Sequence, residues 1–341
     1  MGAELPRVLF IAGPSEDYLA DGLFLGLRAL LGENAVDHPR IDALYASVGP
    51  ERRRELYGRG FGLYASLPDV AVDRLHVDRQ LADGRFDLVL FSDIHRTYGR
   101  FVELLPLLAK SRVAVLDGSD DPSLYPYSGQ YWRRPECWLL PRVHSRYVYF
   151  KREWTEDTLR SRYYRLVPRS LLDRAPVPGN LRRIAFSFPD EKMLPEGARP
   201  EKTSLFPRHI VDAEVRERVA GASAAYAFDS EAAYYADLRQ ARFGITTKRA
   251  GWDCLRHYEI AANGAVPCFR QLADKPSTCA PHGLDDTNAI SYASADELMA
   301  RIDALSPADY ERKQQGALRW AHQNSTRARA RQVLAELGFS L

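Results

Sequence analysis

The sequence predicts an α/β protein built from two successive parallel-sheet halves and a terminal helix. Short, nearly continuous apolar runs, which are typical of parallel strands covered on both faces, alternate with segments of helical periodicity in both halves. A linker-like stretch rich in Pro and Gly, residues 173–180, separates the two series. With 341 residues, the chain is long enough for each half to have its own core.

Composition and charge restrict the possible functions. The chain has 45% hydrophobic and 27% charged residues and a formal net charge of +2, which is ordinary for a globular protein and argues against a general nucleic-acid binder. Four scattered cysteines show no zinc-type spacing and indicate free thiols in a reducing compartment. No signal-peptide pattern and no membrane-spanning run is visible, so we expect a cytoplasmic protein. Arginine clusters leave open a peripheral contact with the inner face of the membrane.

The first half is predicted to alternate strand and helix. Residues 7–12 form an apolar strand and residues 17–31 a helix, in which Gly22 and Gly26 suit a close approach to the sheet. This unit resembles the opening of a Rossmann-type sheet but lacks the GxGxxG fingerprint, which removes the main support for an NAD dehydrogenase. Further strands are predicted at residues 86–91, 112–116 and 147–150.

Polar residues follow these strands, at the sheet edge where open α/β proteins bind ligands. A carboxylate two residues before His95, that of Asp93, could orient the imidazole and raise its basicity. Asp93, His95 and Asp120 are therefore candidates for a catalytic base. The alternatives are a helix N-cap for Asp93, a surface histidine, and an Asx-type turn at 117–121. The sequence does not choose between them.

The second half is predicted to begin with a strand at residues 183–188 that opens a new sheet, followed by a long loop at 189–207. Ser294 and Glu297 form a capping box for a later helix, and the chain ends in a long Arg/Ala-rich helical segment. Helices are further predicted at 213–219, 230–240 and from 306 onward, and a late strand at 290–292.

The most informative stretch is residues 243–269. An apolar run leads into Lys248 and Arg249, then into a helix over 252–263 that stops at Gly264, and a second apolar run follows. A strand, a basic loop, a helix and a strand form a βαβ unit whose helix N-terminus faces two cations. Such a junction favours an anion, most often a phosphate.

One stripe of this helix is mostly polar: Trp252, Arg256, Glu259 and Asn263 follow at i, i+4, i+7 and i+11. Arg256 and Glu259 could form a surface ion pair at i, i+3. Alternatively, Glu259 could lie in a cleft and accept hydrogen bonds from ribose hydroxyls. Helical geometry alone favours the ion pair.

The run from Arg256 to Pro267 resembles the donor-site signature of GT-B glycosyltransferases, a helix glutamate followed by alanine, any residue, glycine, an apolar residue and proline. It looks closest to the bacterial family 1-like enzymes that modify surface polysaccharides. The resemblance implies that Glu259 binds the nucleotide ribose and that the loop before it, with Lys248, Arg249, Gly251 and Trp252, meets the diphosphate. Many retaining members carry a second glutamate where this chain has Gly251, so a retaining or an inverting mechanism stays open.

The resemblance also implies the GT-B architecture: two Rossmann-like domains facing a cleft, with a C-terminal helix crossing back to the first. We assign residues 1–175 to an acceptor domain, 182–320 to a nucleotide-sugar donor domain and 321–341 to the returning helix. The expected function is transfer of a sugar from a nucleotide sugar to a glycan or lipid-linked acceptor in polysaccharide biosynthesis. No metal is expected, because residues 119–121 match a DxD motif poorly. Alternatives are a non-catalytic two-domain nucleotide- or sugar-binding protein and a nucleic-acid-modifying sugar transferase, although no nucleic-acid partner is expected from the charge balance.

Overall fold

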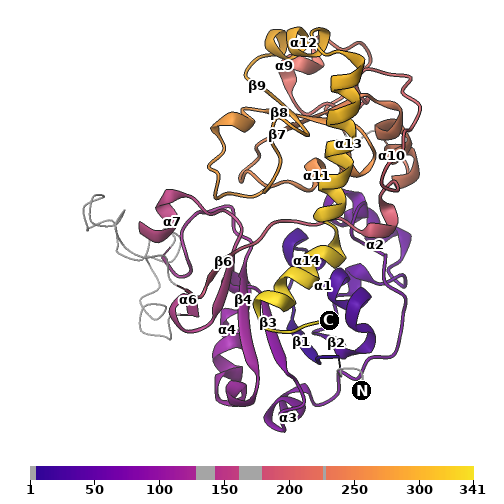
Figure 1. The fold of residues 1–341 in the computed structure, drawn as a ribbon. Coiled ribbons are helices and arrows are strands. Elements are labelled where there is room, and N and C mark those ends of the chain that lie inside the picture. The colour runs from indigo at the N-terminus through magenta and orange to yellow at the C-terminus, as the bar shows by residue number, and fades with distance from the viewer. Residues whose placement is uncertain (1–4, 128–142, 161–178, 226–227) are drawn as a thin grey trace.

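The computed structural model describes residues 5–127, 143–160, 179–225 and 228–341 (Figure 1). Two α/β halves lie one above the other in this view, with the N-terminal half below. The N-terminal half holds a six-stranded sheet in the order β2-β1-β3-β4-β5-β6, and the C-terminal half a three-stranded sheet in the order β7-β8-β9. Every pair of neighbouring strands is parallel. The α/β class with two parallel sheets is confirmed.

Most strands of the first sheet come from mainly apolar segments that are buried between helical layers. They are β1 (Val8–Ile11), β2 (Ala35–His38), β3 (Leu88–Asp93), β4 (Arg112–Asp117), β5 (Val148–Lys151) and β6 (Leu181–Arg183). The helices of this half are α1 (Tyr18–Leu31), α2 (Pro50–Glu55), α3 (Val77–Ala82), α4 (Ile94–Leu104), α6 (Val143–Arg146) and α7 (Glu156–Arg160). Five of these elements, β2, α2, α3, α6 and α7, were not expected; each is only four to six residues long, too short for a clear period.

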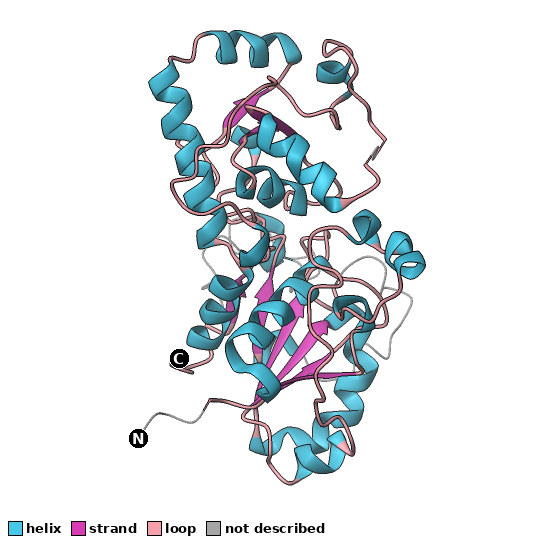
Figure 2. Ribbon diagram, turned by 90° about the vertical axis from the view of Figure 1, so that its right-hand side faces the viewer, coloured by secondary structure: helices cyan, strands magenta, loops and turns pink. Residues whose placement is uncertain are grey.

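The C-terminal half is smaller in sheet and richer in helix (Figure 2). Its elements are α9 (Ala213–Arg216), α10 (Glu231–Gln240), β7 (Phe243–Thr247), α11 (Leu255–Ala262), β8 (Val266–Arg270), β9 (Ile290–Tyr292), α12 (Ala295–Asp303) and α13 (Pro307–Gln323), before α14 (Thr326–Glu336) returns to the other half. Gly264, two residues after the last residue of α11, has a φ of +71°, a left-handed conformation that glycine adopts without strain. The predicted helix stop is thus confirmed.

The strand expected at residues 183–188 does not open the second sheet. β6 ends at Arg183 and pairs with β5 at the edge of the first sheet. The apolar residues that follow, including Ile184 and Phe188, are buried because this segment passes between the two halves. The predicted linker at 173–180 lies mostly outside the described residues, and the domain boundaries stay a prediction.

The terminal helical segment is two helices rather than one. α13 ends at Gln323, and the side chain of Ser325 caps α14 by accepting a hydrogen bond from the backbone N–H of Ala328. α14 lies against α1 of the N-terminal half (Figure 1), so the expected crossing back is confirmed. The close approach expected between Gly26 and the sheet is instead made to α14.

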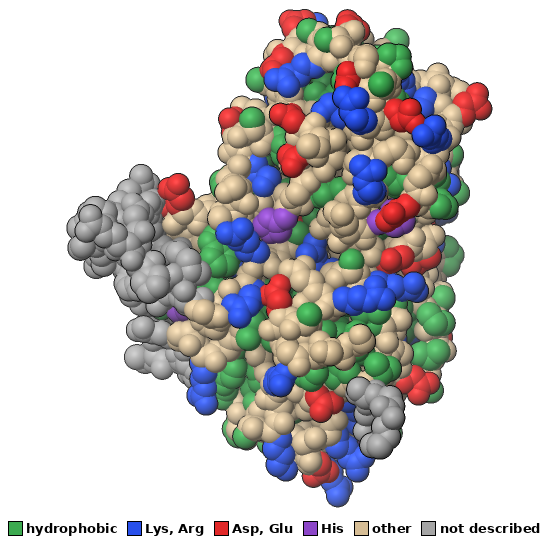
Figure 3. Space-filling view, viewed as in Figure 1, with side chains coloured by type: hydrophobic (Ala, Val, Ile, Leu, Met, Phe, Trp, Pro, Cys, Tyr) green, Lys and Arg blue, Asp and Glu red, His purple; other side chains and the backbone are tan. Residues whose placement is uncertain are grey.

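The surface carries charges of both signs. On the face shown in Figure 3, basic and acidic side chains are interspersed rather than gathered by sign. Within the described residues, no helix is both long enough and apolar enough to span a membrane.

Candidate functional site

A hollow of about 480 Å³ opens at the carboxyl ends of the strands of the N-terminal half. Its walls come from the loops after β1, β3, β4 and β5, which is where open α/β sheets bind ligands. The lining residues are Glu16, Asp17, Tyr18, Tyr57, Asp93, His95, Arg96, Gly118, Ser119, Asp120, Asp121, Arg152 and Phe186. All three candidates for a catalytic base, Asp93, His95 and Asp120, therefore face the same space.

His95 is held by a carboxylate, and that carboxylate belongs to Asp117. The imidazole Nε2 lies 3.2 Å from Asp117 Oδ1. The side chain of His95 is 7% exposed, so the alternative of a surface histidine is wrong. Burial alone would raise the pKa of Asp117, but Lys151 and His95 hold it well below its usual range. Asp117 is thus a permanent negative charge that fixes the ring.

Asp93 plays a different part. Its carboxylate caps α4 by accepting a hydrogen bond from the backbone N–H of His95 at 3.0 Å and pairs with Arg96 at 2.9 Å. The N-cap alternative for Asp93 is confirmed, and the task of orienting the imidazole falls to Asp117. Burial raises the pKa of Asp93 above its ordinary value.

The loop after β4 is a series of side-chain turns. Asp117 accepts from the N–H of Ser119 at 3.1 Å, Ser119 from Asp121 at 3.1 Å and Asp121 from Ser123 at 2.7 Å. The Asx-type alternative is therefore confirmed. Asp120 stands out from this series, half exposed and paired with the guanidinium of Arg152.

The basic loop of the C-terminal half reaches the rim of this hollow. Lys248 and Arg249 are exposed, and Lys248 Nζ lies 4.8 Å from the centre of the Trp252 ring. Helix α11 starts at Leu255 rather than at residue 252, so the backbone N–H groups of Trp252 and Asp253 belong to the loop. The sequence predicts an anion at the helix N-terminus, whereas these two successive N–H groups lie in the cationic loop before the helix, and anion binding there stays a prediction.

Gly251 is buried where the two halves touch. A Cβ atom at this position would lie 2.5 Å from Oε1 of Glu153 and 2.6 Å from Oδ1 of Asp120. Both carboxylates come from the N-terminal half, so a glutamate at position 251 would clash with them and meet like charge. The contact explains why this chain has glycine there.

Glu259 is also enclosed at the contact between the halves. It is 6% exposed, so the alternative of a surface ion pair with Arg256 is wrong. Its Oε2 lies 3.2 Å from the hydroxyl of Tyr234, and burial raises its pKa to about 7. From the other half, Gly62 is so close that a Cβ there would lie 3.7 Å from Oε1. Tyr18 is near both this carboxyl and the hollow. Its side chain lines the hollow, and the pKa of Tyr18 is raised by burial first and by the charge of Glu259 second.

The remaining members of the polar stripe differ in setting. Trp252 and Arg256 are half-buried. Asn263 is fully buried, donates to the carbonyl of Glu259 at 2.9 Å and accepts from Arg239 at 2.9 Å, so the structure does not bring it together with the others. His257, which the sequence did not single out, connects Thr246 and the Trp252 carbonyl at 2.9 and 3.0 Å and holds the loop on the helix.

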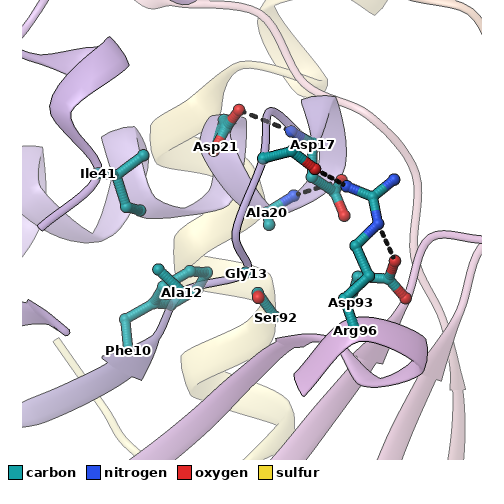
Figure 4. Close-up of a pocket in the computed structure, with 11 residues that line it drawn as sticks. Phe10, Ala12, Gly13, Asp17, Ala20, Asp21, Ile41, Ser92, Asp93 and Arg96 are labelled. Carbon is teal, nitrogen blue, oxygen red and sulfur yellow. Dashed lines mark hydrogen bonds and ion pairs between the residues drawn. The ribbon is translucent and has the colours of Figure 1, made fainter. Parts of the chain in front are cut away.

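A second, very small cavity lies behind the turn after β1 (Figure 4). Asp21 borders it and accepts hydrogen bonds from the Asp17 N–H at 2.9 Å and the Tyr64 hydroxyl at 3.2 Å. Burial raises the pKa of Asp21 to about 8, so this carboxyl is mostly protonated at neutral pH. It supports the turn rather than the larger hollow.

Two residues of the contact were missed by the sequence prediction, Arg152 and Glu153. Their position could have identified them, because they follow a predicted strand, as the candidate catalytic bases do. Arg152 is buried, donates to the Gly118 carbonyl at 2.9 and 3.0 Å and to Glu153 at 2.9 Å, and lies 4.7 Å from the Phe186 ring centre.

No family model matches the chain, and no curated protein sequence matches it. Solved structures do match it over nearly its whole length. Anabaena HepE in complex with UDP-glucose is 8% identical, with 98% of this chain and 99% of HepE covered and a TM-score of 0.51. HepE in complex with UDP and glucose is 9% identical, with coverage of 98% and 100% and a TM-score of 0.53. A glycosyltransferase from Rickettsia africae is also 9% identical, with coverage of 98% and 99% and a TM-score of 0.53. At such identities the similarity concerns the fold.

Proposed function

We propose that this chain, which has the GT-B fold, is a glycosyltransferase that moves a sugar from a nucleotide sugar to a glycan or lipid-linked acceptor. The strongest support is that two sets of functional groups lie on opposite sides of the contact between the halves. A buried helix carboxyl and a cationic loop lie on one side, and a histidine–carboxylate pair in a hollow lies on the other. HepE, with the same fold, binds UDP and glucose.

The donor nucleotide is assigned to the C-terminal half. Glu259 would accept hydrogen bonds from the ribose hydroxyls, which supply the donors that a buried carboxyl needs. Lys248 and Arg249 would neutralise the charge that develops on the leaving diphosphate. In other transferases a metal ion neutralises this charge. We propose that Lys248 and Arg249 do so here and that the reaction needs no metal ion.

His95 is proposed as the catalytic base. The imidazole of His95, which Asp117 orients through Nε2, would take the proton of the acceptor hydroxyl. The acceptor oxygen would then bond to the anomeric carbon as the bond to the diphosphate oxygen breaks, and the nucleoside diphosphate would leave. This single displacement inverts the anomeric centre.

The test is turnover with a panel of nucleotide sugars that includes UDP-glucose, measured as release of the nucleoside diphosphate with glycan and with lipid-linked acceptors. His95→Asn should lower turnover by about 10²–10⁴-fold and remove the acidic limb of the pH–rate profile. Nucleotide affinity should stay unchanged, because His95 lies on the acceptor side.

His76→Asn is the matched control, since His76 is an exposed histidine of the same half, and it should retain parent turnover. A parent protein that binds nucleotide sugars but never releases a nucleoside diphosphate would be a non-catalytic binding protein instead. Parent-like turnover in His95→Asn would exclude His95 as the base.

A further inference from the structure

The proposed function leaves one contact between the halves unused, and Glu153 is its centre. Glu153 follows β5 in the N-terminal half, and its carboxylate extends to the basic loop of the C-terminal half. Oε1 accepts hydrogen bonds from the backbone N–H of Trp252 at 2.9 Å and of Asp253 at 3.2 Å. The same oxygen accepts a third hydrogen bond from Arg152 Nη1 at 2.9 Å.

These three donors form a complete site for an anionic oxygen. Two successive backbone N–H groups and a guanidinium converge on one atom, and the loop that supplies the N–H groups also carries the exposed cations Lys248 and Arg249. A side chain at position 251 would fill this space, and glycine keeps it open. One such site holds one anion, so Glu153 and a phosphate oxygen would exclude each other.

The guanidinium does not depend on Glu153 for its position. Arg152 donates twice to the Gly118 carbonyl, pairs with Asp120, and reaches the Asp253 carbonyl at 3.3 Å. If the Glu153 side chain swung away, Arg152 and the two N–H groups would therefore remain converged. Burial raises the pKa of Glu153 above its ordinary value, which shows that its charged form is held there at some cost.

We propose that Glu153 occupies the place of the donor diphosphate, and that the diphosphate displaces it and takes over its three hydrogen-bond donors. This rests on the proposed function and extends it, because it adds Arg152 of the acceptor half to the groups that bind the leaving group. It also makes donor binding break a contact between the halves and replace it with a bridge through the phosphate.

The experiment is calorimetric titration of the full chain with UDP and, separately, with uridine. Glu153→Gln removes the competing charge, and Glu153→Ala removes the whole carboxylate. Both should bind UDP about tenfold more tightly than the parent, while uridine, which has no phosphate, should bind all three proteins equally. Glu156→Gln removes an exposed charge three residues along and should match the parent for both ligands.

If the parent binds UDP and neither variant binds it more tightly, the displacement is wrong. An equal gain for uridine would also overturn it, since Glu153 would then control access in general. If no protein of the set binds UDP or any other nucleoside diphosphate, the proposed function fails too, which is a different result. Should both variants lose the cooperative unfolding transition of the parent, Glu153→Asp, which is too short to reach both N–H groups, replaces them with the same expectation.

Discussion

Glu259 is a carboxyl group that the structure encloses between the halves. Its Oε2 accepts a hydrogen bond from the Tyr234 hydroxyl, while Gly62 and Leu255 close the space around it. Burial disfavours the charged form, which is why its pKa rises to about 7. A residue held in this state lowers the stability of the protein, and such groups are common at binding sites.

Glu259→Gln should therefore weaken nucleotide binding and yet stabilise the protein at high pH. Folding raises the pKa of Glu259 from about 4.5 to about 7, so the folded state holds a proton that the unfolded state has released. The free energy of unfolding then falls as the pH rises through this window. In Glu259→Gln this decrease in the free energy of unfolding with rising pH should disappear. The affinity for UDP should drop roughly tenfold to a hundredfold.

Thermal unfolding at pH 5 and pH 8, together with calorimetric titration, measures both effects. The control is Glu196→Gln, an exposed carboxyl of the same half, which should change neither. An unchanged UDP affinity would return Glu259 to a purely structural role.

The sequence identified Glu259 and His95 but not their surroundings. Helical spacing put Glu259 on a polar stripe, and only the docking of the other half decides that this stripe is buried. His95 was paired with Asp93 because the two are neighbours in sequence. Asp117, from the adjacent strand, holds the ring in the structure, and such a pairing depends on the order of strands in the sheet. Arg152 and Glu153 were missed for the same reason, since their partners lie about 100 residues away.

At the scale of elements, the contact between α1 and α14 attaches the end of the chain to the first half. Gly26 lies where the two helices touch, and a Cβ atom there would lie 1.9 Å from the Thr326 carbonyl oxygen. Gly22 faces Ser187 in the segment between the halves, and a Cβ atom at Gly22 would lie 2.9 Å from Ser187 Oγ. Two small residues on one face of α1 thus allow a helix and a backbone segment to approach closely.

Gly26→Ala should separate α14 from α1 and destabilise the protein by about 1–3 kcal/mol, as overpacking does. The backbone oxygen that the methyl group would meet cannot rotate away, so one of the helices must shift. Chemical denaturation gives the free energy of unfolding, and amide hydrogen exchange shows whether the loss is concentrated in α14.

Gly99→Ala is the matched control. Gly99 also lies inside a helix, α4, and among the described residues a Cβ atom there would meet no heavy atom within 4 Å beyond its immediate surroundings in the helix. Alanine at this position should be neutral or stabilising by about 0.4–1 kcal/mol. Equal effects of the two substitutions would mean that helix propensity, and not the contact with α14, decides the cost.

Long periodic or apolar segments were predicted well, and short ones were not. The runs that became β1, β3, β4 and β5 are mostly apolar, and their burial follows directly from that. β6 has three residues, two of them arginines, so its pairing comes from its place beside β5 and not from its composition. The expected strand at 183–188 is apolar for another reason, because the segment lies between the two halves.

At the scale of the whole molecule, the sequence predicts two α/β halves because each contains its own series of strands and helices. The contact between the halves could not be predicted, because it joins loops with no common pattern. One part of it is the segment 57–62 of the N-terminal half, which lies against α10. Arg59 donates to the Phe228 carbonyl at 3.1 Å, and Phe61 stacks on Tyr234 at 6.3 Å. A Cβ atom at Gly62, the last residue of this segment, would lie 3.7 Å from Glu259 Oε1, so we expect the segment to act as a cover over Glu259.

Glu231 of α10 holds this cover, because its carboxylate accepts hydrogen bonds from the Gly62 N–H at 2.6 Å and from Lys192 at 2.8 Å. A nucleotide that binds Glu259 must lift the cover, so its apparent affinity falls with the fraction of time the cover is closed. Glu231→Ala should open it more often and raise both the association rate and the affinity for UDP about tenfold. Stopped-flow binding measures the rate, with Glu217→Ala, an exposed carboxyl of the same half, as the control. Unchanged association, despite faster amide exchange at Gly62, would mean that nucleotides reach Glu259 by another path.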